Sequence, residues 1–468
     1  MKKFTILTFT ILCVTATHTF AQGPSGGGGS SSSSVAYSSG ATLTIKSDST
    51  YTGQEYSQTN SDYNVVKDTC ATATLTNCTL TKTGATSSSG DNSSFYGINA
   101  AVYVSKAGVL TMKGGTITTN ADGANSAFCY NGGTLNLYDV TIVNNATRSR
   151  GLHCTGGNGA TIKAYNCHVT TLKGTSSTIA TDRGGGTVYV NGGYYSASGA
   201  KCAIVYSTGD MTVKNIVGYS NNSSEGDIAD IEGDNSITID SCNLTCSGTS
   251  RGVMLYQSGS GDASGYNPIM KISNSYITLK SSEASFCEVP TAVDAFLTLD
   301  KDTIICPSGV LAYVHTNSNW SNSNAKYLNL KLKNGTYTGA LNADATGTIY
   351  VNVASDAVWE GSIDNASTAK VDTVVVNGKW VMDKASNVDV LIINSGATVY
   401  TNGYTLTKTK MTNNGTLDTT STGVTGIDAI MTGNTVDSGK TYTIDGRQVN
   451  GDNLPRGIYI RNGKKFVK

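Results

Sequence analysis

A short apolar pattern recurs ten times along this chain of 468 residues, and the intervals between the copies restrict the folds open to it. Each copy reads apolar, any residue, apolar, polar, a corner residue, two further residues and then usually apolar. Successive copies begin 23 to 37 residues apart. A period of about 20 to 50 residues is typical of a solenoid, whose single units cannot bury an apolar face alone and must stack. The copies begin at Ala73, Leu110, Leu135, Ile162, Val188, Met211, Ile237, Met270, Leu297 and Leu328.

The apolar residues inside each copy alternate, as at Leu110 and Met112 or at Ile237 and Ile239. This period of two predicts a strand with one buried face, because a helix would need spacings of three and four. The fifth position is expected to form a corner, since all but its last occupant tolerate a left-handed backbone or hydrogen-bond their own main chain. The corner residues are Asn77, Gly114, Asp139, Asn166, Gly192, Asn215, Ser241, Asn274 and Lys301.

A second apolar stretch lies between the copies and ends at glycine or an equivalent turn, so that two or three strands make one turn of the chain. Stacked turns would pair each strand with its equivalents above and below at about 4.8 Å. The pattern therefore predicts an all-β fold, a single-stranded parallel β-helix. The second stretches are 101–104, 127–130, 151–154, 202–206, 252–256 and 310–314.

Four segments carry a resemblance to known families: "LTMKGGTI" at Leu110, "LNLYDVTI" at Leu135, "ITIDSCNL" at Ile237 and "MKISNSYI" at Met270. They resemble the β-helix of pectin-lyase-like proteins and, still more, the adhesin-like β-helix repeat proteins of gut Bacteroidetes. The resemblance covers residues 35–422, implies a right-handed helix, and is specific for fold rather than for activity. Corners are weaker after the copy at Leu328, and the register of those later turns stays open.

The beginning of the chain has the features of an export signal. Lys2 and Lys3 precede an apolar, Thr-rich run from Phe4 to Ala16, and a cleavage site after Ala21 fits the small-residue pattern loosely. We expect a signal peptide at 1–21, followed at 22–34 by a flexible Gly/Ser-rich linker. A retained anchor helix is the alternative, although the apolar run is short for a membrane span. The protein is therefore expected to be secreted or held at the outer cell surface.

Residues 423–468 depart from the repeat and are expected to form a small β tail. Asp445-Gly446-Arg447 and the segment from Pro455 to Tyr459 resemble the C-terminal tails that direct type IX secretion in Bacteroidetes. Full sorting domains carry additional upstream strands, and residues 424–440 show none. The alternative is a cap that protects the last turn from edge-to-edge association.

Charge excludes some partners. Charged residues make up 14% of the chain, against about 25% in an average domain, and the formal net charge is zero. The sequence contains no basic run, which argues against nucleic acid and against an anionic membrane surface as partners. We expect no cofactor and no transmembrane segment after signal cleavage.

Ten cysteines remain after the signal peptide, an even number that is typical of disulfides in an exported protein. Their positions favour another role, because Cys78, Cys167 and Cys242 all take the sixth repeat position and so would stack as small buried fillers. Cys129 and Cys154 would be neighbours in successive turns and are the best candidates for a bridge. The chain has no CxxC pair that would suggest a zinc site.

The acidic segment "GDIADIEGDN" is the most conspicuous charged element. We interpret it as a strand edge whose carboxylates point to solvent, with a calcium site formed by Asp227, Asp230 and Asp234 as the alternative. The pair Asp182-Arg183 is interpreted as an exposed ion pair at a turn.

His153, His168 and His315 stand alone among small or apolar neighbours, as packed or surface histidines do. The paired-Asp and Gly-His-Gly elements of β-helix polygalacturonases and the Arg-rich signature of pectate lyases are absent, so no catalytic residue is assigned.

Tyrosine dominates the aromatic residues, with 25 copies against 8 Phe and 3 Trp. Five tyrosines recur near the end of the second stretch, and if their rings point outward they form a ladder that could stack on sugar faces or on a partner protein. The alternative is that tyrosine simply suits a pleated surface. The candidate binding residues are Tyr103, Tyr130, Tyr206, Tyr256 and Tyr313.

The leading functional hypothesis is non-catalytic, adhesin-like binding to an extracellular glycan or to a protein of a host or neighbouring cell. A polysaccharide lyase or glycoside hydrolase of the pectin-lyase-like class is the alternative. A hydrolase would need two carboxylates facing one groove at about 5 to 9.5 Å.

Overall fold

The computed structural model describes residues 38–260, 262–317, 326–364 and 370–420, together with 441–443, 448–449, 458–461 and 464–467. The predicted signal peptide and linker, and the predicted start of the tail at 423, lie outside these residues. Within the described residues no helix is long and apolar enough to cross a membrane.

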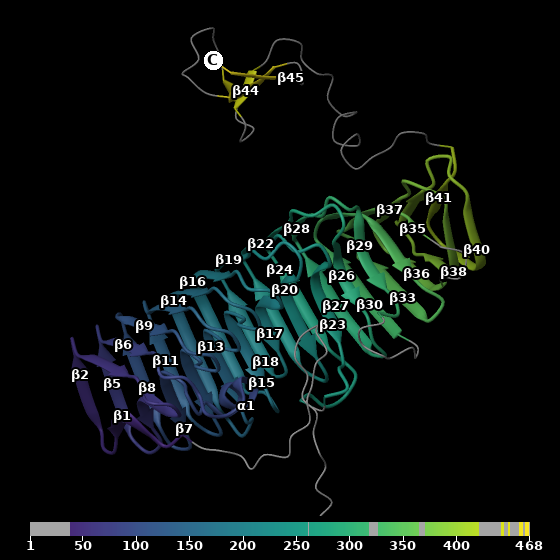
Figure 1. Cartoon of the computed structure of the whole chain (residues 1–468). Helices are drawn as coiled ribbons and strands as arrows, with labels where there is room; N and C mark the ends of the chain where they lie inside the picture. The colour runs from purple at the N-terminus through teal and green to yellow at the C-terminus, as the bar shows by residue number, and fades with distance from the viewer. Residues whose placement is uncertain are drawn as a thin grey trace, which may run out of the picture.

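The described body is a parallel β-helix, as the repeat pattern predicts (Figure 1). Each complete turn contributes one strand to a 13-stranded sheet, sheet A, and in the first part of the chain two strands to a 23-stranded sheet, sheet B. All pairings in both sheets are parallel, so that the strands lie in register along one axis. The strands of sheet A are β1 (Gly40–Ile45), β4 (Tyr63–Asp68), β7 (Val102–Ser105), β10 (Ala127–Tyr130), β13 (Leu152–Thr155), β15 (Ile179–Asp182), β17 (Cys202–Ser207), β20 (Gly226–Glu232), β23 (Arg251–Tyr256), β26 (Ser285–Val289), β29 (Val310–Val314), β32 (Ala340–Ala343) and β35 (Ile363–Asp364).

Sheet B bends at the predicted corners, which separate its two strand columns. The first column is β2 (Ser49–Thr52), β5 (Thr72–Thr76), β8 (Val109–Lys113), β11 (Thr134–Tyr138), β14 (Thr161–Thr171), β16 (Thr187–Ala197), β18 (Asp210–Lys214), β21 (Ser236–Asp240), β24 (Ile269–Ser273), β27 (Asp294–Asp300), β30 (Lys326–Lys333), β33 (Gly347–Val353), β36 (Lys370–Val376), β38 (Ser386–Ile393) and β40 (Leu406–Asn413). The second column is β3 (Glu55–Gln58), β6 (Thr79–Lys82), β9 (Thr116–Thr119), β12 (Thr141–Asn144), the distal halves of β14 and β16, β19 (Val217–Ser220), β22 (Asn243–Cys246), β25 (Tyr276–Leu279) and β28 (Thr303–Ile305).

After β28 the strands of the second column form a separate sheet, sheet C. The later turns therefore still stack as a solenoid, but their two strand columns belong to different sheets. Two stacked tryptophans, Trp359 and Trp380, fill its interior with ring centroids 4.9 Å apart, and their indole N–H groups donate to Gly339 and Gly361 carbonyls at 3.0 and 2.9 Å. Sheet C contains β31 (Thr336–Thr338), β34 (Val358–Glu360), β37 (Lys379–Val381), β39 (Thr398–Tyr400) and β41 (Thr416–Asp418).

All nine predicted corner residues adopt the left-handed backbone, with φ between 51° at Asn77 and 78° at Gly192. The strand registers also confirm nine of the ten predicted starts, since Ala73 pairs with Leu110 and each later start pairs with the next as far as Leu297. The tenth start was wrong by two residues. Leu297 pairs with Leu330, not Leu328, and the corner of that turn is therefore Asn334 at φ 50°.

The interior is one continuous apolar cluster that runs the length of the described β-helix, with like residues stacked in columns. Cys78, Cys167 and Cys242 lie in this core, as predicted, whereas Cys70 is exposed and Cys306 half-buried. The ten described cysteines are all free thiols, although Cys129 and Cys154 are direct register partners.

Two further elements complete the described structure. The helix α1 (Gly90–Tyr96) lies between β6 and β7, begins after the N-cap Ser89 and ends at the left-handed Gly97. In the tail, β42 (Thr441–Thr443), β43 (Gln448–Val449), β44 (Ile458–Arg461) and β45 (Lys464–Val467) form a four-stranded antiparallel sheet.

The stacking of turns predicts where a side chain cannot be added. Gly193 directly follows a corner residue and has a φ of +106° itself. A Cβ at Gly193 would lie 2.1 Å from the carbonyl oxygen of Cys167 in the preceding turn. Gly159 also has a positive φ, +81°, but a Cβ there would meet nothing within 4 Å. We expect Gly193→Ala to lower the free energy of unfolding by about 2 kcal/mol more than Gly159→Ala. Equal losses in chemical denaturation of both variants would contradict close stacking at this corner.

Candidate functional site

All five predicted binding tyrosines lie on sheet A strands, but three of them are nearly or fully buried, which interrupts the expected outward ladder. Tyr103, Tyr206 and Tyr256 are 7%, 5% and 0% exposed, and Tyr130 is half-buried. Tyr313 alone is clearly exposed, and its ring stacks on His315 at 3.9 Å. The five residues therefore do not form one accessible surface.

Other segments of the chain cover parts of the outer face of sheet A, and they account for much of this burial. The hydroxyl of Thr155 on β13 donates to the Phe95 carbonyl of α1 at 2.8 Å, and the Arg150 guanidinium donates to Ser94 at 2.7 Å. Farther along, the segment after β23 contacts the same face, where the hydroxyl of Ser258 donates to Glu232. A sequence pattern that marks strand faces does not reveal such covering segments.

The acidic segment was expected to face solvent, and this expectation was also wrong. Asp227, Asp230 and Glu232 lie on β20 in the middle of sheet A and are 2%, 3% and 0% exposed. Burial raises the pKa of Asp230 well above its ordinary value, and the neighbouring charge of Asp227 adds to this. Asp234 lies apart from them in a turn, where its carboxylate accepts from Asn267.

The three aspartates do not form a calcium site in this geometry. Within the described ranges no three His, Cys, Asp or Glu side chains are grouped so as to hold a metal ion. Asp227 is instead ion-paired with Arg251 at 3.2 Å.

Arg251 joins an ion-pair network across neighbouring turns of sheet A. Its guanidinium binds Asp227 on one side and Glu288 on the other, and His315 contacts the second Glu288 oxygen at 2.7 Å. Burial opposes ionisation of Glu288, but the hydrogen bond from His315 and the charge of Arg251 lower its pKa to about 2. Glu288 is therefore ionised at neutral pH, and its two carboxylate oxygens hold Arg251 and His315 in place. These three residues and Tyr313 line a pocket of about 530 Å³.

Asp182 and Arg183 do not form the exposed pair that their adjacency suggested. Asp182 is completely buried and pairs with Arg150 at 3.0 Å, whereas Arg183 pairs with Asp262 at 3.1 Å. Arg183 follows the end of β15 in the left-handed backbone, and its guanidinium lies over Phe95 and reaches Asp262 instead of its neighbour in sequence. Burial raises the pKa of Asp182 to about 6 despite the charge of Arg150.

An accessible aromatic ladder does exist, on the outer face of sheet B rather than sheet A. Tyr138 and Tyr165 are register partners on β11 and β14, and their rings stack at 4.9 Å with 6° between their planes. Tyr189 on β16 follows at 5.8 Å from Tyr165. Tyr138 is 37% exposed and the other two rings are half-buried. We call Tyr138, Tyr165 and Tyr189 the tyrosine ladder.

A second aromatic row lies beyond the corner in the second column of sheet B. The exposed His168 contacts Tyr194 at 4.6 Å, and Tyr194 contacts Tyr219 at 5.5 Å. Both rows occupy the same few turns, so the outer surface of sheet B is rich in rings there.

The repeat alignment contained the signal for the tyrosine ladder. Tyr138 and Tyr165 both take the fourth, polar position of their copies, in adjacent turns, and this position faces outward by alternation.

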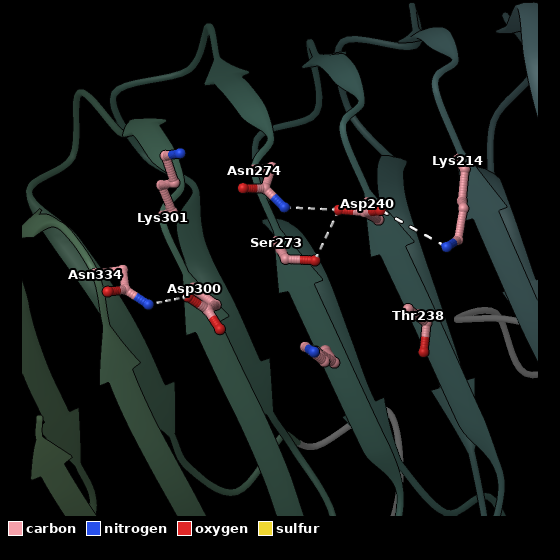
Figure 2. A pocket seen from close by; sticks show the side chains of 9 residues that line it. Lys214, Thr238, Asp240, Ser273, Asn274, Asp300, Lys301 and Asn334 are labelled. Atoms are coloured by element: carbon pink, nitrogen blue, oxygen red, sulfur yellow. Dashed lines mark hydrogen bonds and ion pairs between the residues drawn. The ribbon is translucent and has the colours of Figure 1, made fainter.

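The column that contains Tyr138 and Tyr165 continues through Asn191 to Lys214, where a shallow pocket of about 370 Å³ begins. Figure 2 shows its side chains on successive strands. Asp240 accepts from Asn274 at 2.9 Å and pairs with Lys214 at 3.8 Å, and Asp300 accepts from Asn334 at 2.8 Å. These groups hydrogen-bond and pair with one another, and the pocket extends the polar surface beyond the ladder.

Comparison with protein-family models, with curated proteins and with solved structures finds no match to this chain.

The ion-pair network predicts a pH dependence of stability. The folded pKa of Glu288, about 2, lies below its ordinary value of 4.5. Its stabilising effect is therefore fully present above pH 4.5 and is lost as the pH falls from 4.5 towards 2. The loss is on the order of 3 kcal/mol for a group that remains buried.

The test compares the free energy of unfolding of the wild type and Glu288→Gln from pH 7 to pH 2.5. We expect the gap between them to shrink with acidification, because the wild type loses the charge of Glu288 and the variant has none to lose. Glu283→Gln, at the exposed rim of the same pocket, is the control and should show no such trend. A gap independent of pH would contradict the network.

Proposed function

We propose that this protein is a secreted, surface-associated, non-catalytic β-helix protein that binds an extended extracellular glycan on the tyrosine ladder. The observation that carries this proposal is the row of accessible rings on consecutive turns of sheet B. A rigid solenoid holds such rings at fixed intervals, and its long faces are extended binding surfaces by geometry.

The geometry of the rings supports a chain-like ligand. The rings of Tyr138 and Tyr165 are parallel and stacked on each other, on strands about 4.8 Å apart. They present a row of ring edges and hydroxyl tips to a ligand at a low entropic cost, since a tyrosine ring has few rotatable bonds. Lys113 and Lys163 are exposed beside these rings and can donate hydrogen bonds to oxygen atoms of a bound chain.

The alternative, a carbohydrate-active enzyme, is less well supported, because the carboxyl groups with a raised pKa are buried. General acid catalysis near neutral pH uses a carboxyl group whose pKa is raised and which reaches the substrate. Asp182, Asp230 and Asp302 have raised pKa values, but each is at most 5% exposed. Glu288, which does line a pocket, is held ionised instead.

Export and surface attachment belong to the same proposal. They are supported by the N-terminal sequence pattern and by the low charge and the hydroxyl-rich outer strands. A tail that directs secretion or caps the helix is compatible with the small antiparallel sheet formed by its described strands.

The ladder predicts a defined loss of glycan binding. On an array of extracellular polysaccharides, we expect the double variant Tyr138→Ala/Tyr165→Ala to bind at least tenfold more weakly than wild type, a change of about 1.4 kcal/mol. The control is Tyr404→Ala, an exposed tyrosine outside the ladder.

The same polysaccharides are incubated overnight with the protein and analysed for released oligosaccharides. Unchanged binding by the double variant would overturn the ladder as the site. Release of reducing or unsaturated ends by the wild type would overturn the non-catalytic function and favour the enzyme.

A further inference from the structure

The second column of sheet B carries a long outer surface without aspartate, glutamate, lysine or arginine. From β6 to β28, two residues of each strand face outward, because the residues that alternate with them lie in the core. The strand registers arrange these outward residues in two lines along the solenoid axis, and we call the two lines together the uncharged strip. One line is Thr79, Thr116, Thr141, His168, Tyr194, Val217, Asn243, Tyr276 and Thr303, and the other is Thr81, Thr118, Val143, Thr170, Ser196, Tyr219, Thr245, Thr278 and Ile305.

The uncharged strip is accessible. All of its residues except Ser196 are exposed or half-buried. Val217, Tyr276 and Ile305 are 37%, 46% and 41% exposed. The strip is therefore a surface that a large ligand can reach, and no described segment of the chain covers it as α1 covers part of sheet A.

The lack of charge is a property of this strip and not of sheet B as a whole. Across the corner, the outward positions of the first column carry charges of both signs. A ligand with many charges would find no opposite charge on the strip, and its desolvation there would be uncompensated. The strip therefore favours a neutral ligand. The charged positions of the first column on these turns are Lys113, Lys163, Lys214, Asp240, Lys271 and Asp300.

The dimensions of the strip favour a chain over a folded protein. Strands spaced about 4.8 Å apart and about four residues long, at about 3.3 Å per residue, give a strip of about 40 Å by 13 Å. Its area of about 500 Å² is smaller than the roughly 800 Å² that each partner buries in a standard protein interface. A narrow surface that runs along the solenoid axis suits an extended polymer that lies across the strands.

The chemistry of the strip suits hydroxyl groups. Threonine is its commonest residue, and each threonine hydroxyl can both donate and accept a hydrogen bond. Among the described residues, these threonine hydroxyls have no hydrogen-bond partner and so are free to bind a ligand. The threonine methyl groups and the exposed ring of Tyr276 add apolar contacts between them.

We propose that the uncharged strip is a second polysaccharide-binding surface, which takes an extended chain of neutral sugar units along the solenoid axis. The threonine hydroxyls exchange hydrogen bonds with the sugar hydroxyls, and Tyr276 packs against the apolar part of a sugar unit. This surface adds to the proposed function, but it does not depend on the tyrosine ladder. Because the ladder and the strip lie on opposite sides of the corner, one molecule would hold two chains.

The test measures binding to neutral glucan, mannan and xylan and to acidic polygalacturonate. It starts from the full-length ladder variant Tyr138→Ala/Tyr165→Ala, whose remaining binding does not come from the ladder. We expect this variant to retain binding to at least one neutral polysaccharide. The further changes Thr118→Glu/Thr245→Glu should weaken that binding at least tenfold, because they place carboxylates on the strip. Tyr276→Ala, which removes only an exposed ring, should weaken it as well.

Two controls separate charge from size and position. Thr118→Gln/Thr245→Gln has the same bulk without the charge and should bind as the parent variant does. Thr298→Glu/Thr412→Glu adds the same charge at outward positions outside the strip and should also leave binding unchanged. Circular dichroism checks that each variant is folded.

Four results would overturn the proposal. They are no remaining binding to any neutral polysaccharide, remaining binding to polygalacturonate alone, an equal loss of binding in either control, and a dimer in sedimentation that Thr118→Glu/Thr245→Glu dissociates. Failure of the ladder is seen separately, as equal binding by the wild type and the ladder variant. The two surfaces can therefore fail independently of each other.

Discussion

The main-chain register between successive turns is the constraint on which every other feature of this molecule depends. Parallel strands pair in register from β1 to β40, and each pairing fixes which side chain lies above which. The corners keep this register because their residues adopt the left-handed backbone at the same place in each turn, from Asn77 to Asn334. A strand slip of one residue would exchange the interior and exterior faces, so the continuous apolar core and the ordered outer columns have one common cause.

Stacking also explains why the two large sheets differ in character. In the described turns the outer columns of sheet B carry tyrosine rings, lysines and small polar residues that are exposed or half-buried. α1 and the segment after β23 cover parts of the outer face of sheet A, and charged residues on the strands of this sheet are buried. Buried charges are tolerated only when paired. Arg150 with Asp182, and Arg251 with Asp227 and Glu288, meet this requirement and attach neighbouring turns to one another.

The proposed glycan surface follows from the same stacking. The tyrosine ladder is open and lies on successive turns, which suits a ligand that is itself a repeating chain.

The sequence by itself determined the fold, because the alternation of apolar residues and the corner residues are local properties of each copy. Corners such as Asn166 and Asn274, and the core position of Cys167, follow from the alignment of copies alone. Only the tertiary structure decided which outer face is accessible. Tyr256 and Tyr138 both alternate outward in their strands, yet Tyr256 is buried and Tyr138 is exposed. The segments that cover sheet A interrupt the repeat and carry no period of their own, so where they pack depends on contacts between residues far apart in the chain. The pairing of Arg183 with Asp262, 79 positions apart, follows from the same packing and is invisible in the local pattern.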